Sequence, residues 1–245
     1  MIDVAFTPAS IRPAPLAVVI DVLRASSSIA QALAAGYERV LCCRTIAEAE
    51  ALRAPGRLIA GERGCVKPPG FDLGNSPSGF ATRAADEVVL TTTNGCPAVL
   101  AAEHIADEVL VGCLLNFDSL LSRLEGESDV VLVCAGTDGA PALEDVYLAG
   151  RISAATPGKR TDAARVAESV AVAHPRPEAA LAASADAGAL RAVGLEEDVA
   201  WCARESVLDV VPRMATLVDG AAAIEASPGA TSRVIRQATA PAIHH

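Results

Sequence analysis

Residues 16–35, LAVVIDVLRASSSIAQALAA, set the fold class of this chain, because an apolar run of strand length is followed at once by an alanine-rich stretch of helical length. The same pairing recurs along the 245 residues. It predicts strands over residues 16–22, 39–43, 57–60, 88–92, 108–112, 130–134 and 208–211. It predicts helices over 27–35, 46–53, 96–104, 117–124, 143–154 and 162–173. We therefore expect an α/β fold, with a mostly parallel or mixed sheet covered by helices.

The C-terminal third differs from the rest in having no clear strand pattern. Residues 156–205 contain helical stretches and polar turns with several prolines. No repeat or low-complexity linker separates this part from the remainder. We expect a single α/β domain over 1–245, with 156–205 as a helical elaboration or subdomain.

Composition excludes several classes of protein. The formal net charge of -10 and the aromatic content of 3% argue against nucleic-acid binding, which needs basic stripes and stacking rings. The sequence has no run of eighteen apolar residues and no signal-peptide pattern, so we expect a cytoplasmic protein with no membrane partner. Seven cysteines without CxxC spacing suit reduced thiols.

Polar, glycine-containing loops follow four of the predicted strands: residues 21–26, 61–77, 91–95 and 134–139. The carboxyl ends of strands in such sheets are where ligands bind, so these loops are expected to converge on one rim. In the first loop, Asp21 can ligate a hard cation or attack, and Arg24 can grip an oxyanion. The alternative is that Ser26 or Ser27 caps a helix while Asp21 and Arg24 pair.

The other loops allow a structural interpretation as well. Glu62, Lys67 and Asp72 place both signs of charge in GERGCVKPPGFDLGNSP (61–77), as a metal and anion site requires, although a salt-bridged surface loop would look similar. Thr93, Asn94 and Gly95 suit a phosphate at a helix N-terminus or an ordinary Asn-Gly turn. Glu144 and Asp145 could hold Mg²⁺ or serve the helix dipole.

Spacing excludes the common phosphate chemistries. No two glycines are separated by one residue, so the dinucleotide fingerprint is absent, and the single Gly-Lys pair at 158–159 is not a phosphate loop. There is no GxSxG nucleophile motif. Asp-x-Asp, needed by phosphatases of the haloacid dehalogenase type, is also absent, and no cysteine is followed six residues later by arginine.

The loops resemble those of the 2-phosphosulfolactate phosphatase family. The resemblance rests on DVLRASSS from Asp21, GERGCVKPPGFDLGNSP from Gly61, TTTNGCPA from Thr91, CAGTDGAPALED from Cys134 and a closing DVAWCARESVLDVVP from Asp198. These motifs stand in the family's order and cover most of the chain. The chain departs from the pattern at Cys65, where a second glycine is expected, and at Cys96 and Pro97, where Thr and Arg are expected.

The resemblance implies a Mg²⁺-dependent hydrolase that acts on phosphate monoesters of 2-hydroxy acids, releasing sulfolactate and phosphate on the route to coenzyme M. It also implies a homodimer and a small anionic phosphorylated substrate. The site residues expected from it and from the loops are, as catalytic groups, Asp21, Arg24, Cys134 and Asp138; as substrate ligands, Ser26, Lys67, Asn75, Thr93, Asn94 and Gly95; and as metal ligands, Asp21, Glu62, Asp72, Glu144 and Asp145.

Roles within this set follow from phosphoryl-transfer chemistry, in which positioning and charge neutralisation carry most of the catalysis. Asp21 would ligate Mg²⁺ or attack phosphorus, Arg24, Ser26 and the Asn94-Gly95 turn would cradle the phosphate, and Lys67 would hold the carboxylate or sulfonate. Cys134 would act as a thiolate or only pack. Competing hypotheses are a phosphatase for another 2-phospho-hydroxy acid and a non-catalytic binding module for a phosphorylated metabolite.

Overall fold

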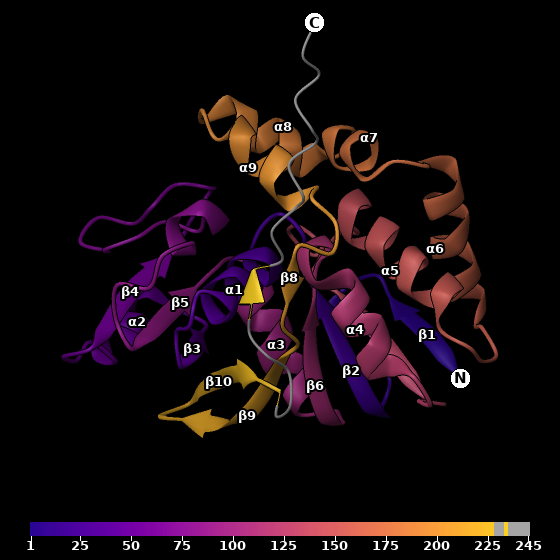
Figure 1. Ribbon diagram of the computed structural model, residues 1–245, viewed down its shortest axis with the longest axis horizontal. Coiled ribbons are helices and arrows are strands. Elements are labelled where there is room, and N and C mark those ends of the chain that lie inside the picture. The colour runs from indigo at the N-terminus through magenta and orange to yellow at the C-terminus, as the bar shows by residue number, and fades with distance from the viewer. Residues whose placement is uncertain (228–232, 235–245) are drawn as a thin grey trace, which may run out of the picture.

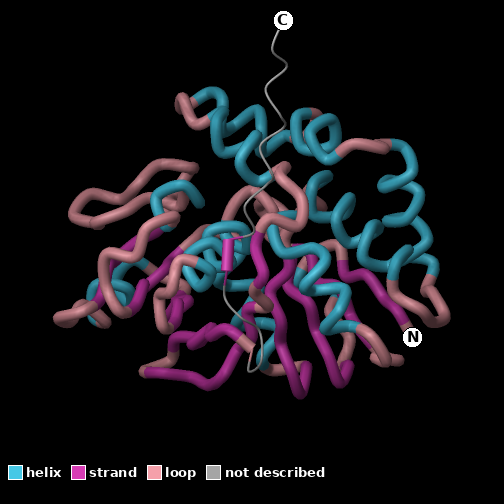
Figure 2. Tube along the Cα trace, viewed as in Figure 1, coloured by secondary structure: helices cyan, strands magenta, loops and turns pink. Residues whose placement is uncertain are grey.

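The computed structural model describes residues 1–227 and 233–234, and within them a mixed sheet is flanked by helices on both faces (Figure 1). The nine strands of that sheet are β1 (Ile2–Ala5), β2 (Ala14–Ile20), β3 (Arg39–Cys43), β4 (Arg57–Gly61), β5 (Glu87–Thr91), β6 (Ala106–Gly112), β7 (Val130–Cys134), β9 (Pro212–Val218) and β10 (Ala221–Ala226). Figure 2 separates these strands from the helices and loops by colour. The predicted α/β class is confirmed.

The sheet consists of two parallel halves joined by an antiparallel hairpin. Its order is β1-β7-β2-β6-β9-β10-β3-β5-β4. Strands β1, β7, β2 and β6 run parallel, as do β3, β5 and β4, whereas β9 and β10 pair antiparallel with each other and with their neighbours β6 and β3. The last two strands of the sheet in sequence therefore lie in its middle.

The apolar runs form strands because both of their faces are buried. In β2, Ala17 and Val19 belong to one hydrophobic cluster, and Leu16, Val18 and Ile20 belong to another on the opposite face. Successive side chains of a strand point to opposite faces, so a continuous apolar run needs helices on both sides. The first cluster continues through strands of both halves of the sheet.

Two central helices bring the two halves together. All ten residues of α1 (Ala25–Ala34) are buried, and α3 (Gly95–Glu103) packs against β2, β6 and β7 on one side and β3 on the other. Because α1 follows β2 and α3 follows β5, the loops at the carboxyl ends of these strands lie near one another. The loops at the carboxyl ends of the two parallel halves of the sheet thus meet above one shared hydrophobic core.

Helices cover the remaining faces of the sheet. Helix α2 (Ile46–Ala51) packs on the half of the sheet formed by β3, β5 and β4. Helices α4 (Phe117–Leu124) and α5 (Leu143–Ala155) cover the half formed by β1, β7, β2 and β6. The elaboration continues with α6 (Asp162–Ala173), α7 (Pro177–Ala182), α8 (Ala185–Ala192) and α9 (Glu196–Cys202), and residues 156–205 contain no strand. In Figure 1, α7, α8 and α9 lie across the top of the molecule, while α6 runs down its side next to α5.

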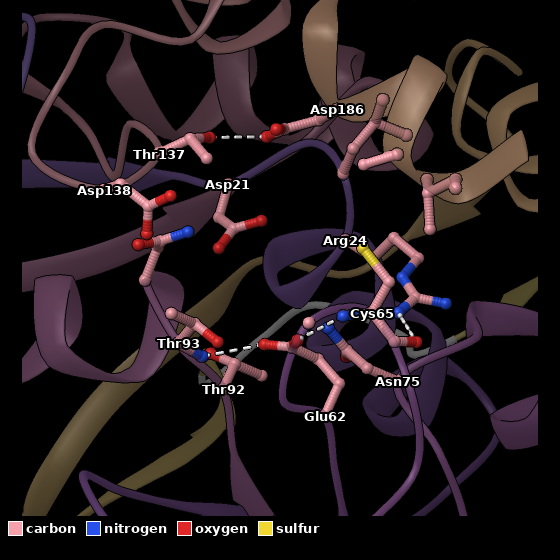
Figure 3. A pocket seen from close by; sticks show the side chains of 15 residues that line it. Asp21, Arg24, Glu62, Cys65, Asn75, Thr92, Thr93, Thr137, Asp138 and Asp186 are labelled. Carbon is pink, nitrogen blue, oxygen red and sulfur yellow. Dashed lines mark hydrogen bonds between the residues drawn. The ribbon is translucent and has the colours of Figure 1, made fainter. Parts of the chain in front are cut away.

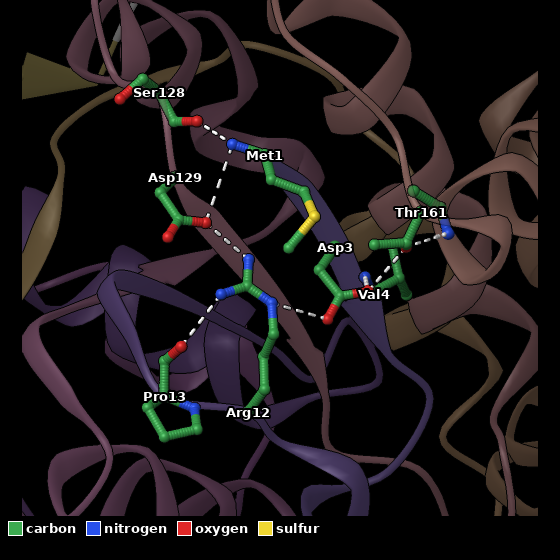
Figure 4. Close-up of polar contacts among 9 residues, drawn as sticks. Met1, Asp3, Val4, Arg12, Pro13, Ser128, Asp129 and Thr161 are labelled. Atoms are coloured by element: carbon green, nitrogen blue, oxygen red, sulfur yellow. Dashed lines mark hydrogen bonds and ion pairs between the residues drawn. The ribbon is translucent and has the colours of Figure 1, made fainter.

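The N-terminal edge of the sheet is held by a polar cluster around Asp3 (Figure 4). Arg12 Nε donates to Asp3 Oδ2 at 3.0 Å, and the same guanidinium pairs with Asp129 at 2.6 Å. Thr161 Oγ1 donates to Asp3 Oδ1 at 2.6 Å, which ties β1 to the start of α6. Edge strands expose unpaired backbone groups, and here charged side chains and a covering loop occupy that edge.

Two sequence expectations differ from the structure. The strand predicted over 208–211 is only β8 (Leu208–Asp209), which pairs with β11 (Arg233–Val234) in a separate two-stranded sheet rather than joining the large one. Strands β1, β9 and β10 are absent from the prediction. Their apolar runs are short or dominated by alanine, so local pattern signals them weakly. Across the described residues, no helix combines the length and apolarity needed to span a membrane.

Candidate active site

A cavity of about 270 Å³ lies where the loops after β2, β4, β5 and β7 meet helix α8 (Figure 3). We call it the acidic cavity, because four carboxylates line it, those of Asp21, Glu62, Asp138 and Asp186. Its other polar lining residues are Arg24, Asn75, Thr92, Thr93, Asn94 and Thr137. The predicted convergence of the four loops on one rim is confirmed by this geometry.

Asp21 lies at the end of β2 and is fixed by the turn into α1. Its Oδ1 accepts the Ala25 amide at 3.0 Å, and its own amide donates to Ser26 Oγ at 2.9 Å. The pKa of Asp21 is raised to about 7, mainly by burial and in addition by the nearby Asp186 and Glu62 carboxylates. A buried carboxyl among other carboxyls needs a proton or a cation to be stable, so this side chain is suited to bind one.

Ser26 serves the fold rather than the cavity lining. Its hydroxyl accepts the Asp21 amide, and its own amide donates to the Asp21 carbonyl at 2.9 Å. The side chain is buried within the turn. Ser26 therefore orients Asp21. The capping alternative from the sequence is wrong, because α1 has no side-chain hydrogen bond at its N-cap and Arg24 pairs with Asp198 rather than with Asp21.

Glu62 braces two loops with one carboxylate. Its Oε1 accepts the Thr93 amide at 2.7 Å and its Oε2 accepts the Cys65 amide at 2.9 Å, so the loops after β4 and β5 are tied together. Figure 3 shows the first of these bonds at the floor of the cavity. Strand β4 lies so close to β5 at this point that a Cβ on Gly61 would be 2.1 Å from the Thr91 carbonyl oxygen. Glycine is required at that position.

Arg24 is buried and is held on three sides. Its Nη1 contacts Asp198 Oδ2 at 2.6 Å and Ser76 Oγ at 3.3 Å, while Nη2 donates to the Cys65 carbonyl at 3.0 Å. Both members of the Arg24–Asp198 pair are nearly inaccessible to solvent. Asp198 lies in α9, so this ion pair anchors the helical elaboration to the rim.

Two further acids lie beneath the cavity instead of lining it. Asp145 accepts the Val22 amide at 2.9 Å and the Gly136 amide at 3.1 Å, which joins the loops after β2 and β7. Burial and then the Glu144 and Asp21 charges hold the pKa of Asp145 well above its ordinary range. Burial, with Asp186 adding, raises the pKa of Glu144 to about 8. Among the described residues, Glu144 Oε2 has no hydrogen-bond partner.

The loop after β7 brings Asp138 to the mouth of the cavity. Asp138 is exposed and has a φ of +52°, a left-handed conformation that Asp tolerates in tight turns. Next to it, Thr137 Oγ1 donates to Asp186 Oδ2 at 2.6 Å. This bond links the β7 loop to α8.

The remaining predicted residues of the substrate set lie at the cavity edge. Asn75 is buried, and its Oδ1 has no hydrogen-bond partner among the described residues. Thr93 is exposed and Asn94 half-buried, at the N-terminus of α3. Gly95 is the first residue of that helix and lies against Asp21. Asn75, Thr93 and Asn94 thus line the acidic cavity, whereas Gly95 is not one of its lining residues.

Three further predicted residues, besides Ser26, Gly95, Glu144 and Asp145, are not among the residues that line the acidic cavity. Lys67 is exposed and lines a neighbouring cavity instead. Asp72 accepts the Ile59 amide at 2.8 Å and lies 3.6 Å from Arg53, so it supports the loop from its outer side. Cys134 is fully buried in the apolar core, and burial raises the pKa of its thiol well above its ordinary value. That placement favours packing over nucleophilic attack.

The three departures from the family pattern also have structural settings. Cys65 has a φ of +68°, a region that favours glycine, which explains why glycine is expected there. Cys96 is buried in the first turn of α3, with its Sγ 3.3 Å from the Leu90 carbonyl oxygen. Pro97 is half-buried in the same turn and is not a lining residue of the cavity.

The donor set fits one hard cation held in part by a ligand. No group of three or more His, Cys, Asp or Glu in residues 1–227 is arranged to hold a metal by itself. Mg²⁺ typically takes only one or two carboxylates and completes its shell with water and phosphate oxygens. Asp21 with Asp138 or Asp186 fits this requirement best. Glu62 and Asp145 each use both carboxylate oxygens on backbone amides, so they have fewer lone pairs to offer.

Sequence reasoning missed two acids of the site, Asp186 and Asp198. Both lie in short helices of the elaboration, where an acidic residue in a first turn is ordinary. The one available signal for Asp198 was that it opens the closing motif of residues 198–212. Asp186 has no comparable sequence signal.

Comparison with known proteins agrees with this geometry. A family model described as 2-phosphosulpholactate phosphatase matches residues 4–216. A probable 2-phosphosulfolactate phosphatase of Thermotoga petrophila is 41% identical over 90% of this chain and 96% of its own length, and one of Pseudothermotoga lettingae is 38% identical over 86% and 95%. The 2-phosphosulfolactate phosphatase of Methanothermobacter thermautotrophicus is 34% identical over 80% of this chain and 85% of its own.

Proposed function

Because the chain belongs to the 2-phosphosulpholactate phosphatase family, a family of phosphoric monoester hydrolases, we propose that it hydrolyses 2-phosphosulfolactate to sulfolactate and phosphate. The observation that carries the proposal is the acidic cavity itself, in which loops after four strands, together with helix α8, place four carboxylates, two side-chain amides and hydroxyls around one small space. A non-catalytic binding module would need cations and amides but no such set of acids.

We propose that a Mg²⁺ ion in this cavity is held by Asp21 together with Asp138 or Asp186. The support is the burial of Asp21 beside other carboxyls, which raises its pKa and which a cation would offset. When bound, the ion would neutralise charge on the phosphate and lower the pKa of a bound water. The chain's own groups would then orient the ester, with the amides at the start of α3 and the Asn75 side chain facing the phosphate.

A phosphate-release assay tests the proposal. The protein is incubated with 2-phosphosulfolactate, 2-phospholactate and 2-phosphoglycolate, with Mg²⁺ and again with a chelator. We expect release from 2-phosphosulfolactate with the highest kcat/KM, and loss of release with the chelator. Release from none of the esters would reject the function, and unchanged release with chelator would reject the metal.

The role of Asp21 has a separate test. Acid quenching during turnover of a radiolabelled ester should trap no protein-bound phosphate if Asp21 only ligates the metal. A trapped acyl phosphate on Asp21 would make it the nucleophile instead.

The homodimer and the place in the route to coenzyme M stay predictions from the resemblance, and the cytoplasmic location stays a prediction from the sequence. Light scattering of the purified protein measures the first of these directly.

A further inference from the structure

A second cavity, of about 220 Å³, adjoins the acidic cavity. Arg24, Cys65 and Asn75 line both cavities and so form the border between them. We call the second one the basic cavity, because Lys67 and Arg24 line it and none of its lining residues is Asp or Glu. The two spaces therefore differ sharply in charge while sharing a wall.

Lys67 is the freest cation at this site. Its side chain is exposed, and the contact that the described residues offer to its Nζ is the Asp72 carbonyl oxygen at 3.5 Å. Arg24, by contrast, is held by Asp198, Ser76 and Cys65. An anion entering the basic cavity would meet a mobile ammonium group on one side and a fixed guanidinium on the other.

The border carries an unused polar atom. Asn75 is 4% exposed, and its Oδ1 has no hydrogen-bond partner among the described residues. A buried amide oxygen without a hydrogen-bond partner costs free energy, so in native proteins such an atom usually accepts a hydrogen bond from a ligand or a water molecule. Its place between the cavities suits a substrate that extends through both.

The remaining wall is apolar and comes partly from the helical elaboration. Val193 and Leu195, from the turn between α8 and α9, line this cavity together with Val66 of the loop after β4. Val66 and Val193 are 54% and 43% exposed, which is unusual for valine and leaves apolar surface next to the two cations. Apolar surroundings strengthen a charge interaction by excluding water.

We infer that the basic cavity binds the non-reacting anionic group of the substrate, a sulfonate or carboxylate, while the ester phosphate lies in the acidic cavity. The inference rests on the proposed function and adds the specificity-determining end of the site. The physical reason is that the two cavities differ in charge, so an anion without a bound cation is favoured in the basic cavity and disfavoured in the acidic one. Four carboxylates repel a bare anion, whereas a phosphate that shares a cation with Asp21 is accepted there.

Lys67→Gln tests the inference, with Lys159→Gln as the matched control. The chain has only these two lysines, and Lys159 lines a different cavity beside Arg160. We expect Lys67→Gln to lower kcat/KM for 2-phosphosulfolactate about tenfold, mainly through KM, the size of one charge-assisted hydrogen bond. Lys159→Gln should match the wild type.

Comparison of two substrates identifies which anionic group of the ester, the sulfonate or the carboxylate, lies in the basic cavity. A selective loss for 2-phosphosulfolactate, with a smaller change for 2-phospholactate, would assign the sulfonate to the basic cavity, and an equal loss for both would assign the carboxylate. If the wild type is active and Lys67→Gln retains its kcat/KM for both esters, the inference is overturned and the proposed function stands. If the wild type is inactive, the proposed function itself fails.

A binding measurement that needs no turnover provides the second readout. Sulfolactate and inorganic phosphate are each added, and the melting temperature is recorded. Lys67→Gln should lose most of the stabilisation by sulfolactate and keep that by phosphate. Equal stabilisation of wild type and variant by sulfolactate would contradict the inference.

Discussion

Asp21 and Gly95 lie so close that no side chain fits between them: a Cβ on Gly95 would lie 2.4 Å from Asp21 Oδ2. Gly95 is the first residue of α3, the helix after β5, and Asp21 directly follows β2. Because β5 and β2 belong to different halves of the sheet, this contact joins the two halves at the site. The carboxylate therefore lies directly against a helix N-terminus, where the backbone amides favour negative charge.

Gly95→Ala should lower kcat about 100-fold or more, because the new methyl group displaces the Asp21 carboxylate from its place. Steady-state phosphate release measures it. Gly79→Ala is the control, since a Cβ there meets nothing within 4 Å. A Gly95→Ala enzyme with wild-type kcat would show that the position of Asp21 is not critical.

Asp21→Asn should lower turnover by about 100-fold or more while leaving the melting temperature nearly unchanged or slightly raised. The amide keeps the shape of the side chain and removes the cost of a buried charge. Activity assays and thermal unfolding of the same preparations check both parts. An active Asn variant would exclude the proposed role of Asp21.

The metal-free protein should lose stability as pH rises from about 4 to about 7. The pKa of Asp21 is about 7 in the folded chain against 3.8 ordinarily, so over this interval the folded state binds more protons than the unfolded state. The free energy of unfolding then falls with pH, by up to about 4 kcal/mol from this group. Urea unfolding at several pH values with chelator measures it, and Asp21→Asn should show a smaller fall.

Mg²⁺ should oppose this loss. In the proposed site the ion would compete with the proton for Asp21, so its apparent affinity should increase as pH rises through about 7. Calorimetric titration at pH 6 and pH 8 compares the two affinities. Equal affinities at both values would separate the metal from Asp21.

Asp198→Ala should destabilise the fold by about 3 kcal/mol or more, because it leaves the Arg24 charge buried without its partner. The KM for the ester should increase as well, since Arg24 lines both cavities. Glu127→Ala, which breaks the partly exposed pair with Arg123, serves as the control and should cost no more than about 1 kcal/mol. Equal costs in urea unfolding would contradict the anchoring role of Asp198.

Cys65→Gly should be more stable than Cys65→Ala by about 1 kcal/mol. Both variants lack the sulfur, so the comparison isolates the backbone, which at a φ of +68° disfavours any residue with a Cβ. Urea unfolding measures the difference. A more stable alanine variant would show that the loop relaxes without strain.

The sequence predicted the fold where burial dictated the pattern. Strands such as β2 and β7 are buried on both faces, so their apolar runs stand out. The hairpin of β9 and β10 was missed, because alanine in β10 suggests a helix and β9 is largely exposed. Its turn carries a usable signal at Asp219 and Gly220, both with positive φ.

For the site, the sequence indicated Asp21, Glu62 and Asp138, because glycine-rich polar loops after strands must lie at one rim. It did not separate the acids that line the cavity from Asp145 and Glu144 beneath it, since that distinction depends on three-dimensional burial. Asp186 reaches the site through the packing of α8, which no local pattern encodes.

The central position of the β9–β10 hairpin has a consequence for synthesis of the protein. A growing chain that has not yet emerged beyond residue 226 cannot close its sheet, and β6 and β3 each keep one open side in the meantime. Such sides attract other strands, so the partly made chain is the form most exposed to aggregation. Strand β10 must therefore leave the ribosome before the two parallel halves of the sheet, and the loops of the acidic cavity that they carry, can be drawn together.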